Sequence, residues 1–144
     1  MLRFNNPSFA AALAEIHTKC FEAPWPEPIF KDLLALPTTF GFMVEQAFIL
    51  CSDLGTDLEI LTLGVLPDYR RKGLATELLK ALKQYAKDNA KSNIFLEVKS
   101  TNTPAIRLYQ KNDFVQTGYR KNYYHEGNQT FDAMCLTWHQ KTSD

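Results

Sequence analysis

Long apolar runs, net charge and a disulfide framework are all lacking in this chain of 144 residues. No apolar run approaches the roughly 20 residues that a bilayer-spanning helix needs, and the N-terminus lacks the basic and then apolar pattern of a signal peptide. The 16 basic and 16 acidic residues cancel, so the overall charge favours neither a nucleic-acid nor a membrane partner. We therefore expect a soluble, cytoplasmic protein.

Cysteine and histidine are scarce and widely spaced. Cys20, Cys51 and Cys135 are odd in number and flanked by apolar residues, which predicts reduced, buried thiols. The three histidines show no metal-ligand spacing, and no cysteine has a histidine partner in a recognisable local signature. We expect neither a metal site nor an acyl-cysteine intermediate.

What is present is the composition of a globular domain, with 45% hydrophobic and 22% charged residues. No repeat, low-complexity stretch or long linker divides it, so we expect a single domain over residues 1–144. Apolar spacing predicts helices over residues 7–20, before Pro37, over 71–90 and over 103–111. Extended patterns predict strands over residues 40–44, 48–51, 58–65, 94–98, 114–124 and 130–138.

The order of these segments indicates the fold class. Strand, helix and strand over residues 58–98 form a crossover unit whose two strands are parallel, and hairpins join most of the other strands. The expected class is α/β (α+β), and residues 140–144 are expected to be a frayed tail.

The helix predicted from Arg71 begins with an unfavourable charge. Arg70, Arg71 and Lys72 would lie at a helix N-terminus, where positive side chains oppose the macrodipole by about 0.3–1 kcal/mol each. A bound polyanion would reverse this effect, because the backbone amides and the basic side chains would bind it together. Gly73 and Ala75 leave the backbone open to such a ligand. By itself the pattern indicates either a phosphate-binding loop or a solvated basic patch.

The two common nucleotide loops, G-x-x-x-x-G-K-S/T and G-x-G-x-x-G, are absent from the sequence. Residues 63–75 instead resemble the acetyl-CoA motif of the GNAT acetyltransferase superfamily, R/Q-x-x-G-x-G/A after a strand. Residues 96–98, 102–109, 113–114, 122–124 and 132–134 resemble the RimI-type ribosomal-protein-alanine N-acetyltransferases of that superfamily. The resemblance covers residues 57–136 well and the first fifty loosely. It implies a central mixed, mostly antiparallel sheet with a splayed parallel strand pair and helices on both faces.

Acetyl-CoA, without a metal, is the cosubstrate that the resemblance implies. The residues implied to hold it are Leu63, Gly64, Val65, Arg71, Lys72, Gly73, Leu74, Ala75, Thr76 and Asn102. The backbones of Leu63 and Val65 would pair with the pantetheine arm where their strand splays from its neighbour. Asn102 would either hydrogen-bond the same arm or shape the turn before the next helix.

Acetyl transfer to an amine needs a base for the amine proton and a proton for the leaving thiolate. Glu97 is a carboxylate in an otherwise apolar strand, which is costly without a partner or a purpose. The pattern alone favours a salt bridge to Lys99 or to a neighbouring strand, whereas the resemblance maps the RimI-type catalytic glutamate onto Glu97. Glu59 is the alternative base.

Tyr109 is the candidate general acid, since the resemblance maps the RimI-type proton donor onto it. Its helical spacing from Ala105 and Leu108 also fits a plain core residue. Tyr123 and Tyr124 resemble the tyrosine pair that holds the acceptor peptide in N-terminal acetyltransferases, and Trp25 lies in the region that shapes the acceptor site. Each of these three aromatic residues also fits simple packing.

The expected reaction is acetyl transfer from acetyl-CoA to the N-terminal α-amine of a protein, by resemblance the N-terminal alanine of a small-subunit ribosomal protein. An α-amine, with a pKa of about 8 against about 10.4 for lysine, is easier to deprotonate. A lysine side chain or a small amine is the alternative acceptor, and a catalytically silent CoA-binding module is the alternative of another class. A nucleic-acid binder is disfavoured by the zero net charge.

Overall fold

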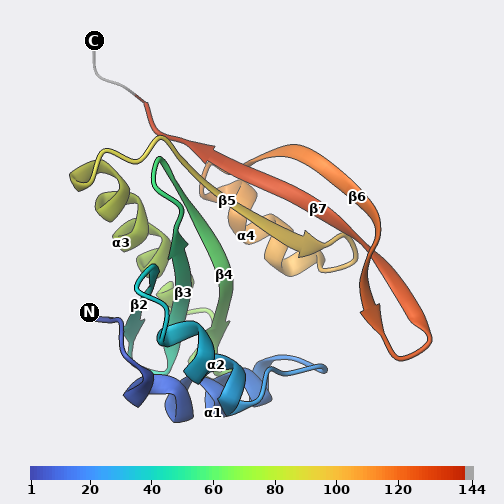
Figure 1. Cartoon of the computed structure of the whole chain (residues 1–144). Coiled ribbons are helices and arrows are strands. Elements are labelled where there is room, and N and C mark those ends of the chain that lie inside the picture. Colours follow the sequence, from blue (N-terminus) through green and yellow to red (C-terminus); the bar gives the residue numbers. More distant parts are fainter. Residues whose placement is uncertain (142–144) are drawn as a thin grey trace.

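Residues 1–141 are described by a computed structural model, drawn in Figure 1. Strands of this part pair in the order β1-β2-β3-β4-β5-β7-β6. The strands are β1 (Leu2–Phe4), β2 (Thr39–Val44), β3 (Ala47–Asp53), β4 (Asp57–Val65), β5 (Asn93–Lys99), β6 (Val115–Glu126) and β7 (Gln129–His139). The helices are α1 (Ala10–Cys20), α2 (Glu27–Leu34), α3 (Leu74–Asp88) and α4 (Thr103–Lys111). None of the described helices has both the length and the apolar character that crossing a membrane would need.

The predicted fold class is confirmed. Strands β4 and β5 are parallel, and the other neighbouring strands are antiparallel. Buried side chains of α1 and α2 pack on one face of the sheet, and those of α3 and α4 pack on the other. The predicted segments agree with the observed ones to within a few residues at each end. Strand β1 was not predicted, because a segment this short shows no periodic pattern.

One predicted helix start is wrong. The helix expected from Arg71 begins at Leu74, because Arg71 and Gly73 adopt left-handed backbone angles, φ 64° and 77°. The basic residues therefore precede the helix and do not lie in its first turn, which weakens the predicted conflict with the macrodipole. Helix α4 is capped by Asn102, whose side chain accepts a hydrogen bond from the Ala105 amide at 3.3 Å.

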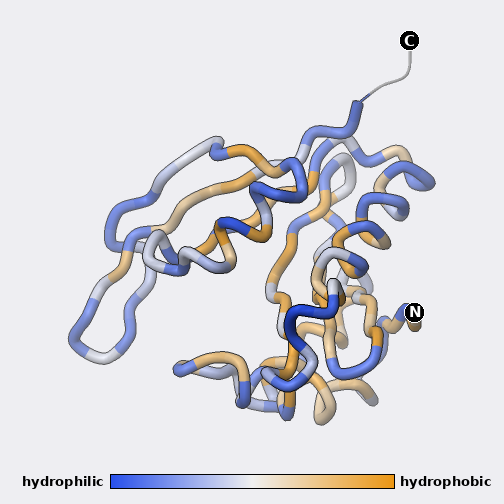
Figure 2. Tube along the Cα trace, turned by 180° about the vertical axis from the view of Figure 1, so that it is seen from behind, coloured by the Kyte–Doolittle hydropathy of each residue, from blue (hydrophilic) through white to orange (hydrophobic). Residues whose placement is uncertain are grey.

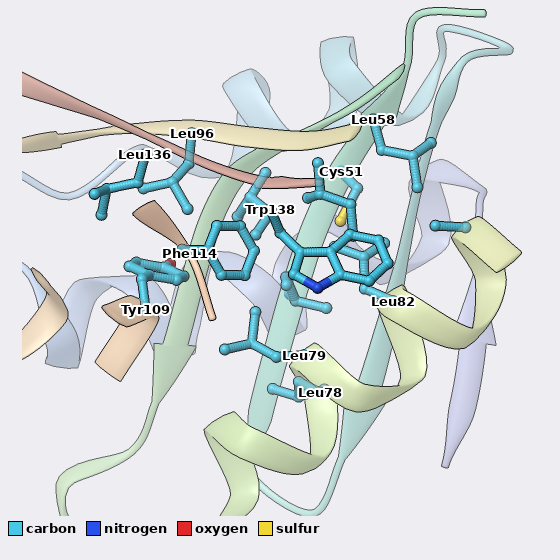
Figure 3. Close-up of a cluster of buried hydrophobic side chains, with 14 of the residues drawn as sticks. Cys51, Leu58, Leu78, Leu79, Leu82, Leu96, Tyr109, Phe114, Leu136 and Trp138 are labelled. Atoms are coloured by element: carbon cyan, nitrogen blue, oxygen red, sulfur yellow. The ribbon is translucent and has the colours of Figure 1, made fainter. Parts of the chain in front are cut away.

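The larger core cluster lies between the sheet and the helices α3 and α4. Figure 3 shows Leu78 and Leu82 of α3 facing Trp138 of β7, with Cys51 of β3 beside them. The prediction of three buried thiols is correct for Cys51 alone, because Cys20 and Cys135 are half-buried; all three are free thiols. Cys20 lies at the end of α1 and Cys135 on the half-exposed β7, positions that a local apolar context does not reveal.

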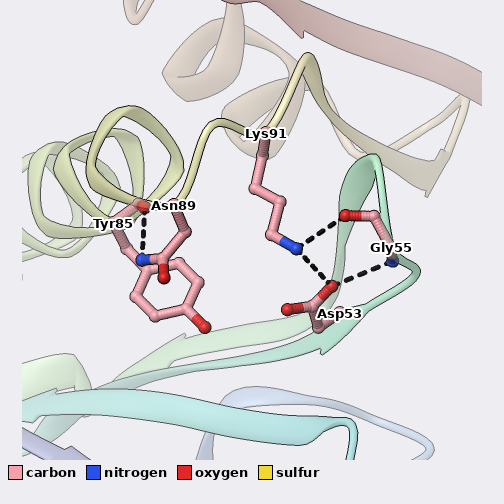
Figure 4. Close-up of polar contacts among 5 residues, drawn as sticks. All are labelled: Asp53, Gly55, Tyr85, Asn89 and Lys91. Atoms are coloured by element: carbon pink, nitrogen blue, oxygen red, sulfur yellow. Dashed lines mark hydrogen bonds and ion pairs between the residues drawn. The ribbon is translucent and has the colours of Figure 1, made fainter.

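Strands β4 and β5 pair at three positions only, from Asp57 opposite Asn93 to Glu59 opposite Phe95. Polar contacts hold this paired end together. The Asn93 side-chain amide donates to the Asp57 carboxylate at 3.0 Å. The Lys91 ammonium donates to the Asp53 carboxylate at 2.9 Å and to a carbonyl in the β3–β4 turn (Figure 4). Beyond Glu59 the two strands diverge (Figure 1), which confirms the splayed pair.

The chain just after β7 is hydrogen-bonded to the residue before β5, at the end of the sheet where β4 and β5 pair. The Gln140 amide donates to the Ser92 carbonyl at 2.9 Å, so the frayed tail predicted from residue 140 begins later. Residues 142–144 of that predicted tail lie outside the described residues.

Strand β4 contains a bulge just after its paired end. Ile60 lies opposite Cys51 and Thr62 opposite Leu50, which leaves Leu61 as an extra residue. One extra residue reverses the alternation of side chains along a strand. As a result Leu63 packs on the same face as Ile60, against the α3 cluster, although the two are an odd number of residues apart.

His17 is a buried polar residue of α1 that packs among aromatic rings. Its side chain is 2% exposed, and its ring stacks on Phe21 and Trp25 with centroids 4.1 and 5.2 Å away. Phe30 of α2 meets the ring edge-on at 5.4 Å. The ring nitrogen Nδ1 accepts a hydrogen bond from the Trp25 backbone amide at 2.9 Å. Burial lowers the pKa of His17 to about 4, so the ring is neutral at neutral pH.

Protonation of His17 is predicted to couple folding to pH. The unfolded chain protonates His17 near pH 6.5, and the folded chain does so only near its lowered pKa of about 4. Stability that is complete above pH 6.5 is therefore lost as the pH falls toward 4, by about 2 kcal/mol at pH 5. His17→Asn keeps an acceptor near the Nδ1 position and cannot be protonated. Urea unfolding at pH 7 and pH 5 should show a smaller pH effect in this variant, and an equal effect would contradict the prediction.

Candidate active site

A cavity of about 810 Å³ opens where β4 and β5 diverge. It is lined by both strands, the end of α1 and the segment after it, the loop before α3 and the start of α3, one side of α4, and Tyr124 and Glu126 of β6. All the residues expected to hold the cosubstrate line it except Lys72. Glu97, Tyr109, Trp25 and Tyr124 also line it, whereas Tyr123 does not. The fold thus brings most of the sequence-predicted site residues to one cavity.

The loop before α3 presents an open helix N-terminus to this cavity. Gly73 is the N-cap residue, and no side chain of the described residues caps the helix there. A Cβ atom on Gly73 would meet nothing within 4 Å, so the approach to the backbone amides is open. The Lys72 ammonium lies 5.1 Å from the centre of the Tyr69 ring, beside the cavity. Free amides, a helix dipole and nearby cations make this end of the cavity suited to an anion.

The unpaired edge of β4 forms one wall of the cavity. The Val65 carbonyl accepts hydrogen bonds from Arg70 Nε at 2.9 Å and from Cys20 Sγ at 3.3 Å. Val65 therefore points its backbone groups away from β3, although the two strands are paired here. Because backbone direction alternates along a strand, Leu63 points its amide and carbonyl to the same side. The Val65 carbonyl is thus already paired within the protein, whereas the backbone groups of Leu63 and the Val65 amide are able to pair with an extended, amide-containing ligand.

Glu97 lies on the face of β5 opposite the large core. Its neighbours Leu96 and Val98 are buried in that core, and the Glu97 side chain, 19% exposed, points to the other face. Glu97 Oε1 lies 3.2 Å from Arg120 Nε of β6. Of the two salt bridges that the pattern allowed, the one to Lys99 is absent because Lys99 pairs with Glu126, whereas one to another strand does form, with Arg120 of β6. Lys99 lies two residues farther along β5, and the cation that pairs with Glu97 comes instead from the hairpin of β6 and β7.

Tyr109 reaches the cavity from the core side of β5. The residue is 6% exposed, and its ring meets Phe114 at 5.5 Å within the large cluster (Figure 3). Burial raises the pKa of Tyr109 above its usual value, and nearby Cys51 and Tyr124 add to this. The phenol therefore keeps its proton and is able to donate it. Tyr109 is both a core residue, as its helical spacing allowed, and a cavity residue, as the resemblance implied.

Glu59 lies near Glu97 but does not line the cavity. Burial raises the pKa of Glu59, the Glu97 carboxylate raises it further, and Arg120 lowers it. The two carboxylates and Arg120 thus form one electrostatic group in which only Glu97 reaches the cavity.

A large bulge in β6 places its tyrosines near Glu97. Between Arg120 and Tyr124, residues 121–123 lie opposite a single residue of β7, Asp132. The Asp132 carboxylate accepts hydrogen bonds from the Asn122 amide at 2.8 Å and the Tyr119 hydroxyl at 2.7 Å. These contacts hold Asn122 in a left-handed conformation, φ 53°. They also lower the pKa of Asp132.

The bulge gives the two tyrosines different surroundings. Tyr124 donates to the Glu97 backbone carbonyl at 3.1 Å, and its pKa is raised to about 12 by burial, by Glu97 and by neighbouring thiol and phenol groups. Tyr123 is 44% exposed and lies 5.0 Å from the Arg120 guanidinium. Figure 2 shows the outer half of the hairpin formed by β6 and β7 as mainly hydrophilic.

Sequence reasoning missed three side chains of this site: His17, Arg120 and Asp132. Asp132 lies within residues 132–134, which resemble the family without indicating a role for this side chain, and the spacing of the histidines gives no chemistry for His17. Arg120 carried no signal at all, because its partner Glu97 is distant in sequence. Among residues 1–141 no group of three or more histidine, cysteine or carboxylate side chains is arranged to hold a metal ion.

Comparison with known proteins adds independent findings. Residues 10–114 match the model of the acetyltransferase (GNAT) family. The N-alpha-acetyltransferase RimI of Mycobacterium tuberculosis is 32% identical over 128 residues, which cover 80% of this chain and 78% of that protein. An N-alpha-acetyltransferase of Saccharolobus solfataricus is 41% identical over 73 residues, and this match spans 50% of this chain and less than half, 44%, of that protein.

Solved structures share the fold. The ribosomal-protein-alanine N-acetyltransferase of Escherichia coli superposes with a TM-score of 0.86 at 23% identity, covering 99% of this chain and 96% of that one. Arabidopsis thaliana NAA60, solved in complex with acetyl-CoA, superposes with a TM-score of 0.79 at 22% identity, covering 96% and 97%. The family match extends over strands β2 to β5, the loop before α3 and all the residues that line the cavity except Tyr124 and Glu126. The chain therefore belongs to the GNAT acetyltransferase family.

Proposed function

We propose that this enzyme transfers the acetyl group of acetyl-CoA to the N-terminal α-amine of a protein, with Glu97 as base and Tyr109 as acid. The observation that carries the proposal is the cavity between β4 and β5, which Glu97 enters from one face of β5 and Tyr109 from the other. The amine nitrogen bonds to the thioester carbonyl carbon and the carbon–sulfur bond breaks. Glu97 receives the proton that the nitrogen loses, and Tyr109 gives a proton to the thiolate.

Acetyl-CoA fits the two ends of the cavity by its chemistry. The pyrophosphate is matched to Arg71, to the open backbone at Gly73 and to the amides of residues 74–76 at the start of α3. The amide-rich pantetheine arm is matched to the unpaired edge of β4 at Leu63 and Val65. The side-chain oxygen of Asn102 already caps α4. We therefore propose that its side-chain amide nitrogen is the atom that contacts the pantetheine arm.

Lys72 enters the proposal only through its charge. Its ammonium lies over the Tyr69 ring and outside the cavity lining. At this position it raises the local positive potential around the proposed pyrophosphate site.

An N-terminal amine is favoured over lysine as the acceptor. Its pKa of about 8 means that a large fraction is neutral at physiological pH, whereas lysine, near 10.4, must be deprotonated at a much higher cost. The names of relatives in Mycobacterium tuberculosis and Escherichia coli support this choice, and the second supports an N-terminal alanine of a ribosomal protein. We propose the same acceptor class here, for one domain spanning residues 1–144 that acts in the cytoplasm.

The acceptor side of the cavity has the composition of a peptide site. Trp25 and Tyr124 line it with apolar surface and Glu126 with a carboxylate. Tyr123, outside the lining, lies next to Tyr124 with ring centroids 5.2 Å apart. On this proposal Tyr123 holds the part of the acceptor peptide that leaves the cavity.

A panel of peptides tests the acceptor. The purified chain is incubated with acetyl-CoA and with peptides that carry either a free N-terminal alanine or a blocked N-terminus and an internal lysine. We expect a gain of one acetyl group on the alanine amine, located by fragmentation mass spectrometry. Acetylation confined to lysine would overturn the acceptor but leave the family assignment intact. Acetyl-CoA alone should raise the melting temperature by mass action, and no shift at saturation would overturn the cosubstrate.

Substitution of the two proton-transfer groups tests their roles. Glu97→Gln and Tyr109→Phe should each lower kcat by roughly a hundredfold or more, since general acid–base catalysis contributes on this scale. The rise in melting temperature with acetyl-CoA should persist, because neither side chain is proposed to bind the nucleotide. Glu15→Gln and Tyr85→Phe are matched controls away from the cavity. Wild-type kcat in either test variant across the pH range would remove that residue from the mechanism.

A further inference from the structure

The imidazole of His17 lines the cavity but has no part in the proposed mechanism. His17 lies on α1, one turn before Cys20 and Phe21, and all three residues line the cavity. Residues three and four positions apart share a helix face. Cys20 of that face contacts the unpaired edge of β4 at the Val65 carbonyl. This face of α1 therefore lies against the strand edge beside which the thioester is proposed to lie.

The contacts of the ring determine which nitrogen carries its proton. Nδ1 accepts the Trp25 backbone amide, so a neutral ring carries its proton on Nε2. Within the described residues Nε2 makes no hydrogen bond, yet every fully buried side-chain nitrogen or oxygen there has a partner. Nε2 therefore retains solvent access. Since the ring is 2% exposed and lines the cavity, this N–H faces the cavity.

We propose that the His17 Nε2–H donates a hydrogen bond to the first peptide carbonyl of the acceptor, and so helps to select a peptide N-terminus over a simple amine. The inference rests on the proposed function, because it requires a peptide acceptor in this cavity. A carbonyl oxygen is the acceptor that a peptide presents closest to its terminal amine. An N–H held in an apolar, aromatic surrounding gains most from a partner, because without one its desolvation is uncompensated.

The surroundings of the ring fit a fixed neutral donor. Phe21, Trp25 and Phe30 surround it, and the backbone bond to Trp25 sets its orientation. Its lowered pKa makes it a weak base, which leaves proton removal to Glu97. His17 thus both positions the segment that carries Trp25 and presents an N–H to the acceptor.

Two substitutions separate these roles. His17→Asn places an amide near Nδ1, where it keeps the contact with Trp25 and loses the donor at Nε2. His17→Gln places an amide N–H near Nε2 and loses the acceptor at Nδ1. The probe is an alanine-initiated hexapeptide that the wild-type chain acetylates, assayed with saturating acetyl-CoA. That activity is established first, so its absence would count against the proposed function and not against His17.

We expect His17→Asn to raise KM for the peptide roughly two- to tenfold, the size of one neutral hydrogen bond, with kcat and the acetyl-CoA melting shift unchanged. His17→Gln should melt earlier but keep KM within about twofold of wild type. A wild-type KM in His17→Asn would overturn the proposal. A rise in His17→Gln as large as that in His17→Asn would also overturn it, because an N–H placed near Nε2 would then fail to restore binding of the peptide.

Altered peptides provide a measurement on the unmodified protein. Replacing the first amide of the hexapeptide by a trans-alkene removes its carbonyl and its N–H, whereas an ester at the same bond removes the N–H and keeps a carbonyl, although a weaker acceptor than that of the amide. With wild-type protein the alkene peptide should show the rise in KM, and the ester peptide should show less of it. Equal KM values for the two peptides would show that the carbonyl is not recognised and would overturn the proposal.

Discussion

The short parallel pairing of β4 with β5 is the constraint on which the site depends. The strands pair from Asp57 to Glu59 and are held there by Lys91 and Asn93. Beyond this point the β4 edge faces a cavity instead of a strand. Unpaired backbone amides and carbonyls in a partly buried position are costly unless a ligand or water pairs with them. The divergence therefore creates a binding surface from backbone groups alone.

Strand β5 has a different kind of side chain on each of its two faces at the cavity. Its alternating side chains place Leu96 and Val98 in the large core and Glu97 on the opposite face. Tyr109 comes from α4 on the core side, where burial keeps it protonated. The proposed base, Glu97, and the proposed acid, Tyr109, are thus separated by one extended backbone. The bulge held by Asp132 completes the base side by placing Tyr124 on the Glu97 carbonyl.

Local sequence patterns predicted much of this arrangement, and their errors have physical causes. Periodicity located the helices and strands because it follows from which face is buried. It placed the start of α3 too early, because the left-handed angles at Arg71 and Gly73 depend on how the loop closes over the cavity. Local patterns also gave Lys99 as one possible partner of Glu97, because they relate only residues that are close in the sequence. The residues of the proposed phosphate loop were found because loop, glycine and helix are contiguous.

The sequence by itself determined the fold class, the order of the elements and the identity of Glu97, Tyr109 and the loop before α3 as candidates. The tertiary structure alone decided which faces of β5 they occupy, that Arg120 pairs with Glu97, and that His17 lines the cavity. The physical reason is the range of the interactions. Caps, turns and apolar periods act over a few residues, whereas these contacts join segments far apart in the chain and exist only once the sheet has formed.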